Sequence, residues 1–104
     1  MINIFSPEQL VNITIVVGQC VVDVNGTRLI SGTASQCMSK LRSMLSNYYP
    51  DSFYSNSVIK ININTEAISA EVADDKSYFL NQIKLLSTSC KCRFEINSGI
   101  HYIG

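Results

Sequence analysis

The first third of the chain shows the two-residue hydrophobic period of half-buried strands, and this period changes phase once. The apolar positions on the predicted core face are Ile13, Ile15, Val17, Cys20, Val22, Val24 and Leu29. The phase change requires a turn or a bulge at Gly18-Gln19, and a two-residue turn would pair Ile15 with Val22. We therefore expect a three-stranded meander, and one long bulged strand over residues 12–24 is the alternative.

Asn25-Gly26 is the strongest turn signal in this region, because this pair is strongly favoured in two-residue hairpin loops. The turn would place Asp23 opposite Arg28 and Val22 opposite Leu29. Asp23 and Arg28 would then form a cross-strand pair of opposite charge on the solvent face.

Two segments have the three-to-four-residue period of amphipathic helices. The first begins at the capping box Thr33-Ala34-Ser35-Gln36 and ends before Pro50. Its predicted apolar face consists of Ala34, Cys37, Met38, Leu41, Met44, Leu45 and Tyr48. The second helix is predicted over residues 75–87, with Asp74 as its N-cap. Its predicted inward residues are Tyr78, Phe79, Ile83 and Leu86.

The remaining alternating segments predict two further hairpins and one short helical turn. Ile59, Ile61 and Ile63 would pair with a strand that carries Ile68, Ala70 and Val72. The segment 90–96 would pair with residues 100–102. A short helical turn would begin at Ser6-Pro7-Glu8-Gln9.

These elements predict a single α+β domain over residues 1–104. The expected order is a short N-terminal helical turn, three strands, a helix, two strands, a helix and two strands. Because the strands have one polar face, we expect a two-layer sandwich with a mainly antiparallel sheet on two helices.

Composition and charge narrow the range of partners. Apolar residues make up 46% of the chain and charged residues only 15%, so the surface is rich in neutral polar groups. Eight basic residues balance eight acidic ones, which gives no net attraction to nucleic acid or to anionic lipid. The opening MINIFSPEQL lacks the pattern of a signal peptide, and we expect a cytoplasmic protein with no membrane contact and reduced cysteines.

The residues that could carry catalysis or bind a metal have simpler structural interpretations. Cys90-Lys91-Cys92 with His101 invites a metal hypothesis, but the predicted hairpin puts His101 on the opposite face. Asp74-Asp75 fits a helix start, where acidic side chains favour the helix dipole. The single histidine leaves little room for nucleophilic catalysis. We therefore expect no enzyme activity, no catalytic residues, no cofactor and no metal site.

An unusual aromatic stretch, SNYYPDSFYSNS, follows the first predicted helix. Tyr48, Tyr49, Phe53 and Tyr54 lie among Ser, Asn, Pro and Asp, and this composition is typical of binding loops. We expect Tyr48 and one of Phe53 or Tyr54 to cover the core. Tyr49 and the other ring are candidate contacts with a protein partner.

The predicted function is that of a small binding protein, an inhibitor or adaptor that occupies the surface of a protein partner. The favoured subclass is an anti-defence or immunity protein of the kind that phages and mobile elements encode. The first alternative is a homodimer, because Val16, Val21, Val58 and Ala67 fall on the solvent face. The second is nucleic-acid binding by a basic strip of Lys60, Lys91 and Arg93, which acidic Glu71 and Glu95 would interrupt.

Overall fold

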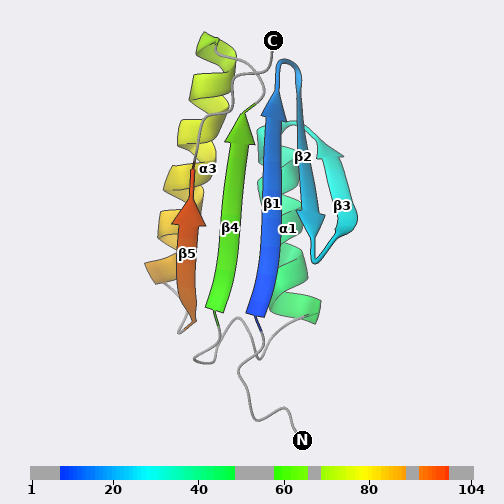
Figure 1. Cartoon of the computed structure of the whole chain (residues 1–104), viewed down its shortest axis with the longest axis vertical. Coiled ribbons are helices and arrows are strands. Elements are labelled where there is room, and N and C mark those ends of the chain that lie inside the picture. The colour runs from blue at the N-terminus through cyan, green and yellow to red at the C-terminus, as the bar shows by residue number, and fades with distance from the viewer. Residues whose placement is uncertain (1–7, 49–57, 66–68, 89–91, 99–104) are drawn as a thin grey trace, which may run out of the picture.

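The protein folds into one mixed five-stranded sheet with two helices (Figure 1). The computed structural model describes residues 8–48, 58–65, 69–88 and 92–98. Their order is β1 (Glu8–Val16), β2 (Gln19–Val24), β3 (Thr27–Gly32), α1 (Ala34–Tyr48), β4 (Val58–Thr65), α3 (Ala70–Thr88) and β5 (Arg93–Asn97). The strands lie side by side in the order β3-β2-β1-β4-β5.

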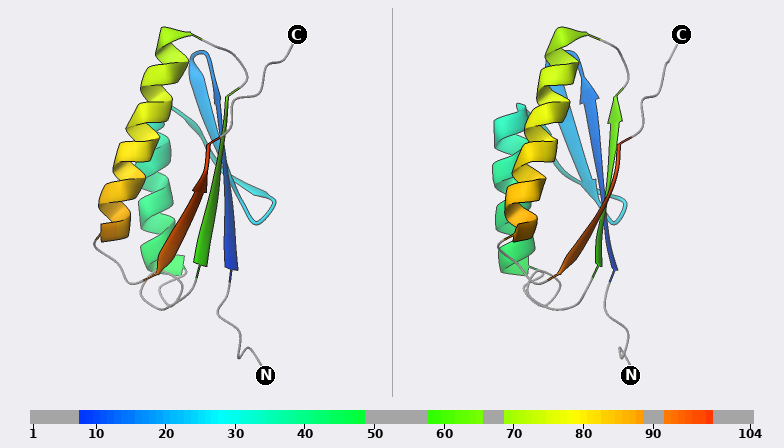
Figure 2. Two further views of the ribbon diagram at one scale, coloured as in Figure 1. Left: turned by 60° about the vertical axis from the view of Figure 1, so that its left-hand side comes forward. Right: turned by 90° about the vertical axis from the view of Figure 1, so that its left-hand side faces the viewer.

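The sheet combines an antiparallel half and a parallel half. β2 is antiparallel to both β1 and β3, whereas β4 is parallel to both β1 and β5. Parallel neighbours need a crossover connection, and α3 provides it between β4 and β5. Both helices lie on the same face of the sheet, as the turned views in Figure 2 show. No described residue covers the other face, which we call the open face.

The first hairpin is shifted by two residues from its predicted register. Ile15 pairs with Cys20 instead of Val22, because the turn is formed by Val17 and Gly18. Gly18 has a φ of 83°, a conformation that glycine adopts without strain. The core prediction was therefore wrong for Val17, which is 60% exposed, while Val11 replaces it as a buried residue.

The second hairpin matches its prediction at the turn. Asn25 and Gly26 have φ values of 51° and 87°, and Asp23 lies opposite Arg28. One pairing was wrong: Val22 pairs with Ile30, because the register shifts between Val22 and Asp23. This shift inserts an extra residue into β3 and lets Leu29 and Ile30 both pack against the core.

The capping box at the start of α1 is confirmed. The Thr33 backbone N–H donates to Gln36 Oε1 at 3.0 Å, and the Gln36 N–H donates to Thr33 Oγ1 at 3.1 Å. These two bonds satisfy donors that a helix start leaves unpaired. The inward face of the helix is buried as predicted, at Ala34, Cys37, Met38, Leu41, Met44 and Leu45.

The second half of the chain departs furthest from the predicted order. The expected hairpin of residues 59–63 with 68–72 is wrong, because Ala70 and Val72 belong to α3. Asp74 is not the N-cap; Ser69 has that role and accepts the Val72 N–H at 3.1 Å. β4 pairs instead with β1 and β5, so the expected second strand between β4 and the helix does not form.

The two ends of the predicted fold also change. β5 joins the sheet in parallel to β4, whereas residues 100–102 of the expected final hairpin lie outside the described residues. Glu8 and Gln9 open β1, so the expected helical turn does not include them.

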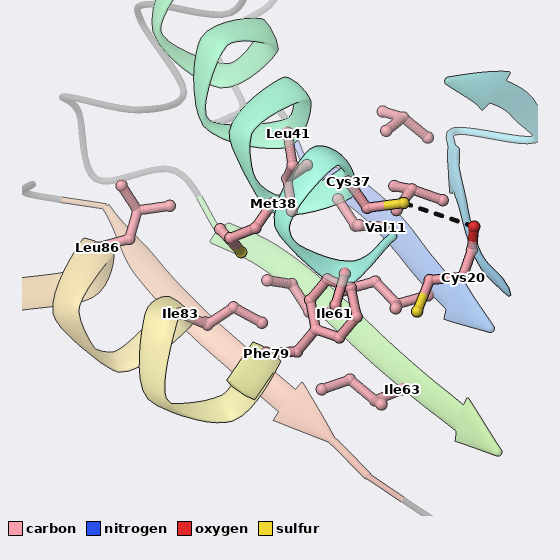
Figure 3. Close-up of a cluster of buried hydrophobic side chains, with 14 of the residues drawn as sticks. Val11, Cys20, Cys37, Met38, Leu41, Ile61, Ile63, Phe79, Ile83 and Leu86 are labelled. Atoms are coloured by element: carbon pink, nitrogen blue, oxygen red, sulfur yellow. Dashed lines mark hydrogen bonds between the residues drawn. The ribbon is translucent and has the colours of Figure 1, made fainter. Parts of the chain in front are cut away.

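The core lies between the sheet and the two helices (Figure 3). Phe79 and Ile83 from α3 are fully buried and belong to the same core cluster as Leu41 of α1 and Ile61 of β4. The predicted inward residues of the second helix are thus confirmed at Phe79, Ile83 and Leu86, and Tyr78 is half-buried. Among the described residues, no helix is long and apolar enough to cross a membrane.

Candidate functional site

The open face has a continuous row of polar side chains that crosses all five strands. Strand pairing places Arg28, Asp23, Asn12, Asn62 and Asn97 in line, and we call this line the polar row. Asn62 Nδ2 donates to Asn12 Oδ1 at 3.1 Å, and Arg28 Nε donates to Asp23 Oδ1 at 2.7 Å. The row therefore presents a hydrogen-bonding surface whose own members are already partly paired.

Apolar side chains flank the polar row towards the amino ends of β1 and β4. Leu10 is 40% exposed and lies opposite Lys60, whose neighbour on β5 is Glu95. Val58 is half-buried and lies opposite Arg93. This end of the open face thus combines two aliphatic side chains with nearby charges of both signs.

The predicted basic strip is present only in part, and it is neutralised locally. Lys60 and Arg93 lie on the open face as expected, but Arg93 Nη2 bonds Glu95 Oε2 at 2.8 Å. Lys91 lies outside the described residues. The prediction that Glu71 shares this face was wrong, because Glu71 belongs to α3 on the helix side of the sheet.

The aromatic stretch that the sequence singled out falls almost wholly outside the described residues. Tyr48 is the last residue of α1, and Tyr49, Phe53 and Tyr54 follow beyond the described part. The flanking elements locate its two ends, because α1 ends and β4 begins at the same end of the sheet (Figure 1). Val58 opens β4 at that end, near Leu10 and Lys60. The role of the aromatic stretch in partner binding stays a prediction.

A second feature lies at the opposite end, where both helices begin. A cleft of about 280 Å³ is bordered by the β1–β2 turn and by the first residues of α1 and α3. Glu71 Oε2 accepts the Gly18 backbone N–H at 2.6 Å, and Asp75 Oδ2 accepts the Cys20 thiol at 3.8 Å. The Cys37 thiol donates to the Cys20 carbonyl oxygen at 3.5 Å, which Figure 3 shows as a dashed line. Each of these acidic side chains and thiols thus has a partner inside the fold.

The two thiols beside this cleft are held in their protonated form. Burial raises the pKa of Cys20 to about 12, and the negative charge of Asp75 acts in the same direction. Burial also raises the pKa of Cys37. A thiol is a weak nucleophile until it ionises, so neither side chain is prepared for covalent catalysis at neutral pH.

The sequence predicted the burial of these cysteines correctly, but it did not predict the role of Asp75. Cys20, Cys37 and Cys92 are buried thiols, as the inward pattern predicted, while Cys90 and His101 lie outside the described residues. The role given to Asp75 at a helix start was wrong, since it lies in the second turn of α3 and contacts Cys20. The described part of the chain contains no group of three or more His, Cys, Asp or Glu residues placed to hold a metal ion.

Comparisons with known proteins give no match that would indicate a function. No protein-family model, no curated protein and no solved structure matches the chain.

Proposed function

We propose that this chain is a non-enzymatic binding protein that occupies the surface of a protein partner through the open face of its sheet. The observation that carries the proposal is the bare face of the parallel strands β1, β4 and β5. Parallel strands are normally covered on both faces, because each crossover helix adds a layer. A bound protein would supply the layer that no described residue supplies.

The chemistry of the open face supports a protein as the partner. Protein interfaces combine aliphatic contacts with hydrogen bonds and contain few uncompensated charges at their centre. The polar row offers amide groups at its centre, and Leu10 and Val58 offer apolar contact beside it. The nearby cations Arg28 and Arg93 are each paired with a carboxylate, which lowers the electrostatic attraction to nucleic acid.

The aromatic stretch supplies a second argument from the sequence. Its flanks, the end of α1 and the start of β4, lie at the same end of the sheet as Leu10 and Val58, so Tyr49, Phe53 and Tyr54 are proposed to extend the same contact surface. A compact chain of 104 residues with such a surface fits the class of small inhibitors and adaptors that act by occupying the surface of a partner. We place it with the anti-defence and immunity proteins of phages and mobile elements, acting in the cytoplasm.

The test is partner capture with a variant of the open face and a matched variant elsewhere. The double substitution Leu10→Arg and Asn62→Arg puts two cations on the open face, while Asn81→Arg puts one on an exposed position of α3. We expect wild type and Asn81→Arg to enrich the same protein from host extract. The open-face variant should bind that protein at least about tenfold more weakly, which corresponds to about 1.4 kcal/mol of binding free energy.

Two further measurements separate the alternatives. Equal capture by all three proteins would contradict the open face as the contact surface. A concentration-dependent dimer mass in light scattering, lost in the open-face variant, would show that a second copy covers this face. A separate variant with Tyr49→Ser, Phe53→Ser and Tyr54→Ser tests the aromatic stretch, because it leaves the open face unchanged.

A further inference from the structure

The outer edge of β3 is the feature that neither the core nor the open face explains. β3 forms one border of the sheet and pairs with β2 alone among the described residues. Its backbone groups on the other side have no strand partner in that part of the chain. Such an edge can accept an additional strand from another chain.

A groove follows this edge between β3 and α1. It consists of two adjoining hollows of about 700 and 470 Å³, and Lys40 lines both of them. Leu29 and the buried Met44 line the first hollow, and Ile30 lines the second. The register shift in β3 brings the neighbours Leu29 and Ile30 to the helix side together, so β3 gives each hollow one apolar side chain among its polar lining residues.

The charges along the groove are of one sign. Arg28 and Lys40 are the charged residues that line it, and no lining residue is acidic. Arg28 is paired with Asp23 at 2.7 Å, whereas Lys40 makes no ion pair with any residue that the structure describes. An occupant with a carboxylate opposite Lys40 would therefore complement the groove.

We propose that this groove binds an extended acidic peptide, which adds to the free edge of β3 as a sixth strand. Every second side chain of the peptide faces the groove. Apolar side chains of this set pack on Leu29 and Ile30, and a carboxylate of the same set, placed between them, meets Lys40. Main-chain hydrogen bonds to β3 supply affinity, and the Lys40 contact selects the acidic sequence.

A second copy of this chain fits the groove less well. The strand that a copy would contribute, TRLISG, contains Arg28 and no acidic residue. Pairing two copies of β3 would bring each copy's Arg28 towards the other's cationic groove, and like charges at close range oppose association. Charge complementarity thus favours a different chain with an acidic strand.

The probe is the synthetic peptide Thr-Val-Thr-Glu-Thr-Val-Thr, compared with the same peptide containing Lys instead of Glu. We expect the Glu peptide to bind at least tenfold more tightly, and its binding to shift the backbone amide resonances of Thr27–Gly32. The exposed substitution Lys40→Glu should invert the preference between the two peptides. Absent binding, equal affinities or an unchanged preference in the variant would overturn the proposal.

Backbone methylation distinguishes strand addition from charge attraction alone. Two versions of the Glu peptide are N-methylated, one at the odd and one at the even positions. Strand pairing uses one edge of the peptide, so one version should lose binding and the other keep it. Equal binding of both versions would refute strand addition. Concentration-dependent shifts of the β3 amides without peptide would assign the edge to a second copy and would also overturn the proposal.

This inference does not depend on the open face. The variant with Leu10→Arg and Asn62→Arg should bind the Glu peptide as tightly as wild type, because both positions lie outside the groove. Loss of partner capture with retained peptide binding would separate the two surfaces.

Discussion

The two faces of β1 and β4 are made by alternating residues of the same strands, yet they differ in almost every property. On the helix side, Val11, Ile13, Ile15, Ile59, Ile61 and Ile63 have no exposed surface. On the open side, Leu10 is 40% exposed and Asn12 and Asn62 are half-buried. The helix side therefore supplies most of the stability, and the open side is left comparatively unconstrained for contact with another molecule.

The largest expected effect separates two adjacent residues of β4. Ile61→Ala removes a fully buried side chain, and we expect a loss of about 2–5 kcal/mol in the free energy of unfolding. Asn62→Ala removes only the hydrogen bond to Asn12, so its cost should be about 1 kcal/mol or less. Urea unfolding of both variants measures the difference. Similar losses would mean that the open face contributes to stability as strongly as the core does.

The same contrast explains which parts of the fold the sequence predicts. The helix-side residues of β1, β2 and α1 follow strict periods of two or of three to four, and the structure confirms nearly all of them. The capping box at Thr33 and Gln36 and the turn at Asn25 depend on local hydrogen bonds and φ values. These interactions involve only residues that are close together in the chain, so the local sequence is enough to predict them.

Strand pairing depends on residues far apart in the chain, and the wrong predictions of the fold concern such pairing. Ala70 and Val72 alternate like a strand, but Val72 also begins the helical spacing that continues to Phe79, Ile83 and Leu86. The longer period prevails because it buries more apolar surface against the sheet. The polar face of β4 predicted antiparallel partners, whereas β4 is a parallel strand with one face that no described residue covers. The partner-binding role assigned to the aromatic stretch has no such structural answer and stays a prediction.

The free energy of unfolding should depend on pH through Cys20, which lies on the helix side of the sheet. The thiol ordinarily titrates near 9.0, and burial in the fold raises its pKa to about 12. Between these values the unfolded chain releases a proton that the folded chain retains. Stability from this group is therefore complete below pH 9 and decreases as the pH rises towards 12, by up to about 1.4 kcal/mol per pH unit.

Cys20→Ala removes this titration and gives the control. Unfolding in urea at several pH values from 8 upward should show a smaller decrease in stability for the variant than for wild type. The comparison uses the slopes with pH, because the substitution also changes packing at a residue that is 1% exposed. Identical slopes would contradict the raised pKa.

Asn25 tests whether substituting an exposed residue always has a small effect on the free energy of unfolding. It is exposed, but its Oδ1 accepts the Leu10 N–H at 2.9 Å and its Nδ2 donates to Gln9 Oε1 at 2.8 Å. It also has a φ of 51°. We expect Asn25→Ala to lose about 1–2 kcal/mol in thermal or urea unfolding. Asn25→Gly should lose less, because glycine keeps the φ and gives up only the side-chain bonds. Equal losses for the two variants would assign the effect to the bonds alone.

A smaller effect is expected for the cross-strand pair on the open face. Asp23 and Arg28 are joined at 2.7 Å, with 31% and 59% of their side-chain surfaces exposed. A double-mutant cycle with Asp23→Ala and Arg28→Ala should give a coupling of about 0.2–1 kcal/mol, because solvent screens an exposed pair. Added salt at 1 M should reduce it further, since the screening length is then about 3 Å.

The pair of Arg93 and Glu95 is the matched control for that cycle. It has a similar distance of 2.8 Å but lies within one strand, with 71% and 45% of the side chains exposed. Its coupling should be the smaller of the two, because only the pair of Asp23 and Arg28 also holds two strands in register beside the shift in β3. A coupling well above about 1 kcal/mol for either pair would mean that the open face is stabilised by its own charges. A partner would then have to break those contacts, and the division between a stabilising face and a binding face would fail.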